Sequence, residues 1–190
     1  MWNKALAFFC SLFNFLYQAI VPCTFPNLLP VNTVDRQQYL GRWYFKTAVS
    51  HREADVQRFR ALDNIWFNIE ETAKDTLVLT GHMRTGDDCV NQTWTYHIRP
   101  DREDLELKGK KERRSLLWTG KWANCAECIV MQEIEPPLRE TDSEDSLSRH
   151  MLYGRQRDTA SEMVSMFLKN AACHNMTVSV QPPQKKEFCP

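Results

Sequence analysis

The sequence predicts an all-β domain, an antiparallel up-and-down barrel of eight strands with one C-terminal α-helix packed against its outside. Three observations lead to this prediction. Short strand-type runs recur along the chain with turn residues between them, a spacing typical of an antiparallel barrel or sandwich. One helical pattern follows the last of these runs, and a Gly-x-Trp pair, Gly41 and Trp43, opens the first.

The predicted strands are short and rich in aromatic and β-branched residues. The clearest is Asn64–Glu70, in which Ile65, Phe67 and Ile69 alternate with residues of the opposite face. A ninth short strand is expected at Met176–Val180. The eight barrel runs are Arg42–Val49, Asn64–Glu70, Thr76–Met83, Val90–Ile98, Asp104–Lys108, Ser115–Trp122, Ile129–Ile134 and Arg149–Gln156.

One segment breaks the strand pattern near the C-terminus. Asp158-Thr159 can cap a helix that begins at Ala160. Apolar residues then recur at helical spacing, at Met163, Met166 and Phe167. This stripe predicts an amphipathic helix that packs on the barrel.

A hydrophobic head precedes the domain. Lys4 is followed by an uncharged apolar run from Ala5 to Val21, which as a helix would span about 25 Å at ~1.5 Å per residue. That length falls short of the ~30 Å hydrocarbon core and fits a secretory signal. Since the usual small residues of a cleavage site are missing, both cleavage and retention stay open. We expect residues 1–22 to form an uncleaved, signal-like anchor and residues 23–190 to form one domain.

The composition excludes several function classes. Basic and acidic residues balance at 24 each, which argues against nucleic-acid binding. No glycine-rich phosphate loop and no nucleophile–base pair is suggested by spacing, so we expect neither an enzyme nor a cofactor. The Cys125-x-x-Cys128 spacing suits zinc or redox chemistry, but no second ligand pair accompanies it, so no metal is expected.

Cysteines and glycosylation sequons indicate a secreted protein. Of seven cysteines, Cys10 lies in the head, and the other six permit 15 pairings that the sequence alone cannot resolve. The sequons Asn91-Gln92-Thr93 and Asn175-Met176-Thr177 predict N-glycosylation of Asn91 and Asn175.

The order of these elements resembles the lipocalin family. In that family the glycine of Gly-x-Trp lets the chain turn into the first strand and the tryptophan closes the barrel floor. An arginine at the end of the last barrel strand packs over the tryptophan. In this chain Gly41 and Trp43 match the Gly-x-Trp pair, and Arg155 matches the arginine. The late Thr-Asp-Tyr motif of the family is absent, which marks an outlier branch. Similarity to a lipoprotein-associated branch is carried by four stretches: Leu40–Phe45, Asp63–Asn68, Cys89–His97 and Leu152–Arg155.

This resemblance implies a secreted, monomeric carrier of a small amphiphilic lipid such as sphingosine-1-phosphate. It also implies that the retained hydrophobic head anchors the protein in HDL-like lipoprotein particles. Arg149 and Lys110 would receive the phosphate and Glu133 the ammonium group. Three aromatic residues would contact the head group, namely Trp94, Tyr96 and Tyr153. Strand parity places Trp94 and Tyr96 on one face with Gln92, and Asn91 on the other. Gln92 and Lys110 each stand where the branch has an arginine, which predicts an altered head-group preference.

The resemblance also implies disulfides between Cys23 and Cys173 and between Cys89 and Cys189. Cys125 matches a third half-cystine, but Met163 stands at its expected partner position in the helix. Cys128 is then either the substitute partner of Cys125 or a free thiol.

Other functions stay open at this point. The same barrel could carry a retinoid or a fatty acid, or act as a protein-interaction lipocalin through its loops and the acidic stretch near Glu140–Asp145. An enzyme of the lipocalin-type prostaglandin isomerase kind would need a reactive cysteine inside the cup, and none falls on the predicted pocket faces.

Overall fold

The computed structural model describes residues 23–24, 26–137, 146–158 and 160–190. The hydrophobic head and the acidic stretch near Glu140–Asp145 therefore lie outside the described residues.

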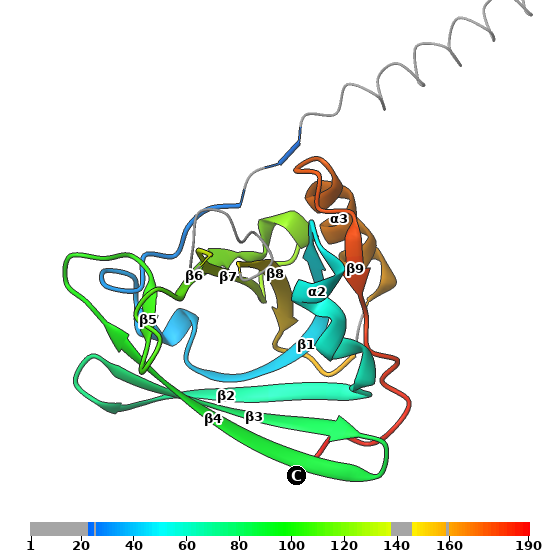
Figure 1. The fold of residues 1–190 in the computed structure, drawn as a ribbon, viewed down its shortest axis with the longest axis horizontal. Coiled ribbons are helices and arrows are strands. Elements are labelled where there is room, and N and C mark those ends of the chain that lie inside the picture. Colours follow the sequence, from blue (N-terminus) through cyan, green and yellow to red (C-terminus); the bar gives the residue numbers. More distant parts are fainter. Residues whose placement is uncertain (1–22, 25, 138–145, 159) are drawn as a thin grey trace, which may run out of the picture.

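Eight antiparallel strands close into a barrel, as the sequence predicts (Figure 1). Each strand pairs with the next along the chain, and β1 pairs with both β8 and β2, which closes the ring. The ninth strand, β9 (Val178–Val180), adds to the outer side of β1 at Ala48–Ser50. The barrel strands are β1 (Gly41–Ser50), β2 (Asn64–Ala73), β3 (Thr76–Thr85), β4 (Asp88–Ile98), β5 (Leu105–Leu107), β6 (Arg114–Thr119), β7 (Cys128–Glu135) and β8 (Leu147–Gly154).

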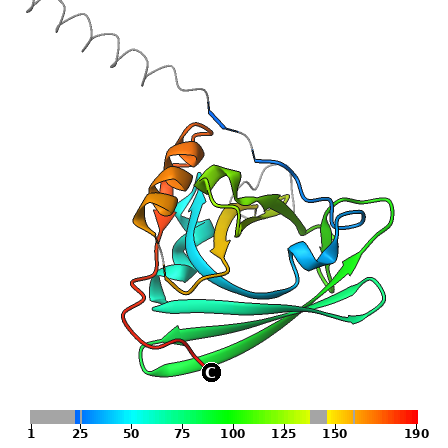
Figure 2. The ribbon, with the colours of Figure 1, turned by 180° about the vertical axis from the view of Figure 1, so that it is seen from behind.

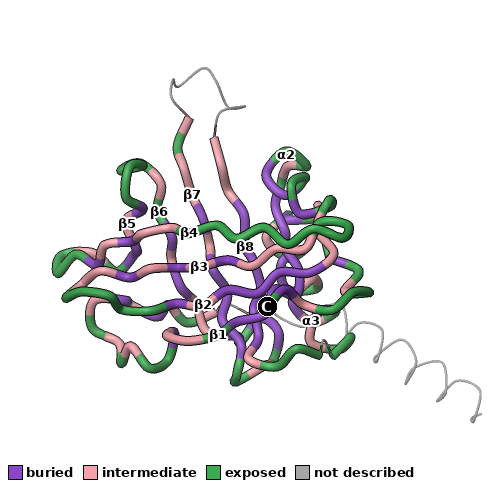
Figure 3. The backbone as a smooth tube through the Cα atoms, turned by 90° about the horizontal axis from the view of Figure 1, so that it is seen from below, coloured by how far each residue is buried: buried purple, intermediate pink, exposed green. Residues whose placement is uncertain are grey.

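The alternation of side chains along the strands sorts apolar residues into two cores. The larger core fills the lower part of the barrel, where Trp43, Phe45, Phe67 and Ile69 turn inward. In Figure 3 the buried residues (purple) lie mainly in the middle of the barrel strands, and most connecting loops are exposed (green).

The second core lies between the barrel and the helix α3 (Ser161–Ala172), which packs on the outer face (Figures 1 and 2). Phe167 and Ala171 of α3 pack against Trp122, Val130 and Leu152 of the barrel side. Within the described ranges, no helix is long and apolar enough to cross a membrane.

The expected helix cap is wrong in detail. The residue before α3 is Ala160, whose side chain caps nothing, and the helix begins at Ser161. The backbone of Asp158 instead binds to the barrel, because its carbonyl accepts one of the three hydrogen bonds that the Lys46 ammonium donates. The carbonyls of Gln156 and Arg157 accept the other two.

Strands β8 and β6 end earlier than expected. β8 ends at Gly154 and not at Gln156, since the chain there turns to meet Lys46. β6 ends at Thr119, and the expected remainder to Trp122 forms the 3-10 turn η3 (Gly120–Ala123). This turn buries Trp122 against α3, where its indole N–H donates to the carbonyl of Thr24 at 2.6 Å.

Between β1 and β2 the chain forms α2 (Glu53–Val56) and the 3-10 segment η2 (Gln57–Ala61), which sequence reasoning missed. A shorter 3-10 turn, η1 (Arg36–Gln38), precedes β1. Val56 and Phe59 are the apolar residues that α2 and η2 bury in the barrel core. The segment thereby covers part of the open end of the barrel.

Three disulfides connect segments of the described chain. Cys23 is joined to Cys173 and Cys89 to Cys189, the pairs that the resemblance implies. Cys125 is joined to Cys128, the first of the two alternatives for Cys128. Met163 lies beside this bridge, with its sulfur 3.2 Å from the Cys128 sulfur.

Candidate ligand-binding site

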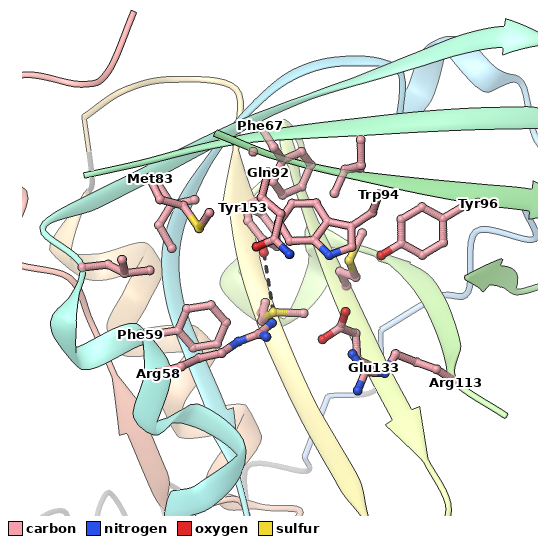
Figure 4. A pocket seen from close by; sticks show the side chains of 16 residues that line it. Arg58, Phe59, Phe67, Met83, Gln92, Trp94, Tyr96, Arg113, Glu133 and Tyr153 are labelled. Carbon is pink, nitrogen blue, oxygen red and sulfur yellow. Dashed lines mark hydrogen bonds between the residues drawn. The ribbon is translucent and has the colours of Figure 1, made fainter. Parts of the chain in front are cut away.

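The open half of the barrel holds a cavity of about 210 Å³ between the covering segment and the strand walls (Figure 4). Most of the residues that line it are apolar or aromatic, and a few polar side chains stand among them. The lining residues are Arg58, Phe59, Leu62, Ile65, Phe67, Leu79, Gly81, Met83, Gln92, Trp94, Tyr96, Arg113, Met131, Glu133, Met151 and Tyr153.

Trp94 forms one wall because β3 leaves room for it. Gly81 lies beside it, and a Cβ atom at Gly81 would come within 2.8 Å of the Trp94 ring. The missing side chain lets the indole lie flat against β3. Gln92, Trp94 and Tyr96 all line the cavity, whereas the Asn91 side chain belongs to the outer face and is exposed.

Glu133 and Arg149 form a buried ion pair across β7 and β8, where their Cα positions are paired in register. Nε of Arg149 donates to a Glu133 carboxylate oxygen at 2.7 Å, and one Nη donates to the Asp55 carbonyl at 2.9 Å. Burial alone would raise the pKa of Glu133, but the adjacent Arg149 guanidinium, together with Arg58 and Arg113, outweighs burial and holds the pKa below its usual range. Glu133 is therefore ionised and already paired. Arg149 lies behind it and is not part of the cavity lining.

Tyr96 and Tyr153 bring hydroxyl groups into the same cavity. Burial raises the pKa of both phenols, and the charge of Glu133 raises them further. Both are therefore neutral hydrogen-bond donors at physiological pH. The Tyr153 hydroxyl lies 3.5 Å from the Met151 sulfur (Figure 4), a weak acceptor that leaves the proton available to a better one.

Two arginines that sequence reasoning did not select line the cavity. Arg58 reaches in from η2, and Arg113 lies on the opposite wall beside Glu133 (Figure 4). Arg113 is paired with Glu135 through a 2.7 Å bond from its Nε. Arg58 forms no ion pair with any carboxylate of the described residues. Burial by its surroundings and repulsion by Arg149 lower the pKa of Arg58, and attraction by Glu133 opposes them in part. The residue as a whole is exposed.

Lys110 lies outside this cavity. Its side chain is 52% exposed, and its ammonium group is 3.6 Å from Glu135. It instead lines a cationic opening on the side of the barrel, together with Arg58, Lys108 and Arg113 and a stretch of β4. Lys110 is thus placed to meet a group at the mouth, not one inside the cup.

The floor contains the three residues that the resemblance selects. Gly41 adopts a left-handed φ of 90°, which admits the turn into β1. Trp43 is 2% exposed, and its indole N–H donates to the Tyr39 carbonyl at 2.8 Å. The Arg155 guanidinium lies 3.7 Å from the centre of the Trp43 ring. These contacts close the barrel at the end opposite to the polar groups.

No group of three or more metal-ligating side chains capable of holding an ion occurs in the described part of the chain.

A barrel with one closed end, an apolar cup and polar groups at its mouth defines the lipocalin class of binding proteins. The siderocalin Ex-FABP, described as acting through dual ligand specificities, has a similar structure with a TM-score of 0.60 and 16% identity, covering 80% of this chain and 97% of that one. A second siderocalin gives a TM-score of 0.59 at 17% identity, over 82% of this chain and 95% of that one.

The particular family follows from the sequence as a whole. A family model described as the ApoM domain matches residues 1–190. Apolipoprotein M of Rattus norvegicus and that of Mus musculus are each 24% identical to this chain over 198 residues, covering 100% of this chain and 98% of theirs. The chain belongs to the apolipoprotein M family and has the fold of a lipocalin-type lipid-binding carrier.

Proposed function

We propose that this protein is a secreted carrier that holds one small amphiphilic lipid with an anionic head group, such as sphingosine-1-phosphate. The observation that carries the proposal is the side chain of Arg58, a cation without a carboxylate partner among the described residues that faces an apolar cup. Arg58 is exposed at the edge of the cavity, so its guanidinium is available to bind an anionic group through charge-assisted hydrogen bonds. An anionic head group would supply the missing partner.

The balance of charge at the mouth favours an anion over a cation. Of the three cations there, Arg113 and Lys110 both pair with the carboxylate of Glu135, and Arg58 pairs with no carboxylate of the described residues. Glu133, which would receive an ammonium group, is already paired with Arg149. The excess charge is therefore positive.

The division of labour we propose follows from these positions. Arg58 and Arg113 would bind the phosphate from within the cup, and Lys110 would approach it from the side opening. Arg149 would act through Glu133, whose carboxylate it fixes in the wall. Trp94 would pack against the head group, and the Tyr96 and Tyr153 hydroxyls would donate to it.

A long-chain ligand needs more room than the cavity provides. Its volume of about 210 Å³ lies below the roughly 300–1,000 Å³ of ordinary ligand pockets. Three unbranched methionines line it and can change rotamer at little cost, namely Met83, Met131 and Met151. We propose that these side chains move aside as the lipid chain enters.

The direct test is a binding titration with lipids that differ only at the head. Sphingosine-1-phosphate, sphingosine, a fatty acid and retinol would each be titrated against the parent and against Arg58→Gln. Loss of one charge-assisted hydrogen bond, ~1.5–3 kcal/mol, predicts a tenfold or greater loss of affinity for the phosphate and little change for retinol. Equal binding of the phosphate by both proteins would remove Arg58 from the site. Tighter binding of retinol or of the fatty acid would instead identify this chain as a carrier of that lipid.

Arg60→Gln is the matched control for this titration. Arg60 lies in the same segment η2, but its side chain is exposed and pairs with Glu53 outside the cavity. The substitution removes the same charge from the protein without changing the cup. It should leave all four affinities at their parental values.

A carrier is favoured over an enzyme because no cysteine occurs among the residues that line the cavity. Turnover of any of the four lipids on incubation with the protein would contradict this part of the proposal.

Association with lipoprotein particles is the second part of the proposal. Three disulfides fit an oxidising, extracellular destination, and the apolar run Ala5 to Val21 fits an anchor that inserts into a lipid surface. Monomeric full-length protein should float with lipoprotein particles in a density gradient, and residues 23–190 alone should not. Equal flotation of the two would show that the head is not the anchor.

A further inference from the structure

Strand β4 leaves one edge of the barrel unpaired. Its pairing with β3 runs from Asp88 to His97, whereas its pairing with β5 covers only Tyr96–Ile98. The ladder with β5 ends where the Thr95 carbonyl accepts a bond from the Lys108 N–H at 2.9 Å. Asp88 to Thr93 therefore has no strand neighbour on this side within the described ranges.

The backbone of this edge can accept another strand. Along an antiparallel strand the N–H and C=O of one residue point to the same side, and successive residues alternate. Thr95 directs its carbonyl toward β5, so Thr93 and Asn91 direct their N–H and C=O groups to the same, open side. Such a row of free donors and acceptors is a template for pairing with another chain.

The side chains of the edge offer little of the usual protection. Natural edges are guarded by charged residues or proline, but the stretch Asp88–Ile98 contains only one such residue, Asp88 beside the turn. It is rich in residues that favour strands. Val90 is 50% exposed, and among the described residues no other large hydrophobic residue is classed as exposed. Figure 3 shows the exposed first part of β4 along the side of the barrel.

A glycosylation sequon lies in the middle of this poorly guarded edge. Asn91-Gln92-Thr93 places its acceptor on the outer face of β4, where both Asn91 and Thr93 are exposed. The inward neighbours Gln92 and Trp94 line the cavity, so a group attached to Asn91 points away from the ligand. A glycan there would occupy the space that a pairing strand needs.

We propose that an N-linked glycan on Asn91 shields the free edge of β4 and keeps the protein monomeric, and that without it two copies pair through this edge. The modification joins the Asn91 amide nitrogen to the anomeric carbon of an oligosaccharide. It breaks the bond from that carbon to a polyprenyl diphosphate donor, and the amide proton leaves with the released diphosphate. The glycan replaces the charged side chain that guards edges elsewhere.

Three substitutions of one residue separate the glycan from the side chain. Thr93→Ser keeps the sequon, Thr93→Val removes it with little change of shape, and Thr93→Lys removes it while adding a charge to the edge. Each full-length protein would be secreted from glycosylating cells. Peptide mass would report the glycan on Asn91, and light scattering after size-exclusion chromatography would report the molar mass at equal protein concentration.

The expected pattern is specific to an edge shielded by a glycan. The parent and Thr93→Ser should be glycosylated monomers, and Thr93→Val should show about twice the protein mass as a dimer. Thr93→Lys should stay monomeric without the glycan because a charged lysine on an edge strand opposes pairing with another strand. Asn175→Gln, which removes the other sequon, should remain monomeric. Unmodified Asn91 in the parent, or a monomeric Thr93→Val, would overturn the proposal.

A second measurement covers the case in which Thr93→Val is not secreted. Parent protein carrying only high-mannose glycans can be trimmed after folding with an endoglycosidase that leaves one sugar on each asparagine. Trimming should raise the dimer fraction of the parent and leave that of Thr93→Lys unchanged. An unchanged mass for the trimmed parent, or an equal rise in both proteins, would overturn the proposal. Neither result depends on which lipid the cup holds.

Discussion

Truncation of the floor residue Trp43 to alanine should destabilise the barrel by about 4 kcal/mol. The indole is 2% exposed, and truncation of such a residue costs ~3–5 kcal/mol through lost burial and the cavity left behind. Its N–H donates to the Tyr39 carbonyl at 2.8 Å, and the Arg155 guanidinium stacks on it at 3.7 Å. The truncation also removes a hydrogen bond worth ~1 kcal/mol and a cation–π contact worth ~0.5–2 kcal/mol. These contributions are included in the total loss of stability and place it above the lower end of the range for truncation.

Urea unfolding of the lipid-free protein measures this loss, and the head-group titration measures its specificity. A domain of this size should lose about 8–16 °C in Tm for 4 kcal/mol, while the ratio of its affinities for sphingosine-1-phosphate and sphingosine stays at the parental value. Trp118→Ala is the control, because Trp118 is partly exposed and packs outside the barrel, so it should cost less than half as much. A loss below about 1 kcal/mol for Trp43→Ala, or a changed head-group ratio at unchanged stability, would refute its role as the floor.

Two further perturbations test the buried polar groups. Glu133→Gln should cost ~3–5 kcal/mol because it leaves the Arg149 charge buried and unpaired, whereas Glu133→Leu combined with Arg149→Met should cost less than that single change; urea midpoints that rank the other way would contradict a paired interior. Stability should also fall as pH drops from about 6.5 to 4. Burial lowers the pKa of His150 to about 4, helped by His174 and His51, so the unfolded chain, with an ordinary histidine pKa of ~6.5, binds more protons than the folded one throughout this window. At about 1.4 kcal/mol per pH unit the loss approaches 3 kcal/mol, and it should shrink in His150→Phe; an unchanged pH slope in that variant would exclude His150 as the cause.

The barrel is predictable from sequence because its determinants are local. Alternating runs such as Asn64–Glu70 reveal a half-buried strand without reference to the rest of the chain. Strand parity likewise puts Gln92, Trp94 and Tyr96 on one face, and all three line the cavity. What parity cannot give is register, and only the register places Glu133 directly opposite Arg149.

The covering segment escapes prediction because it is too short for periodicity to show. α2 has four residues and η2 five, fewer than the window in which a helical repeat can be recognised. The inward direction of Arg58 depends on where this segment rests on the barrel, which is a property of tertiary packing. The same holds for the end of β8, where the Lys46 ammonium gathers three carbonyls from a stretch that reads locally as strand and helix cap.

Native mass spectrometry of the secreted protein tests the lipid-carrier account most directly. The account predicts the chain in complex with one amphiphilic lipid of acidic head group, retained by the parent and by Arg60→Gln but depleted in Arg58→Gln. A protein that emerges from secretion with no lipid, or one whose bound lipid is neutral and equally abundant in all three proteins, would contradict it.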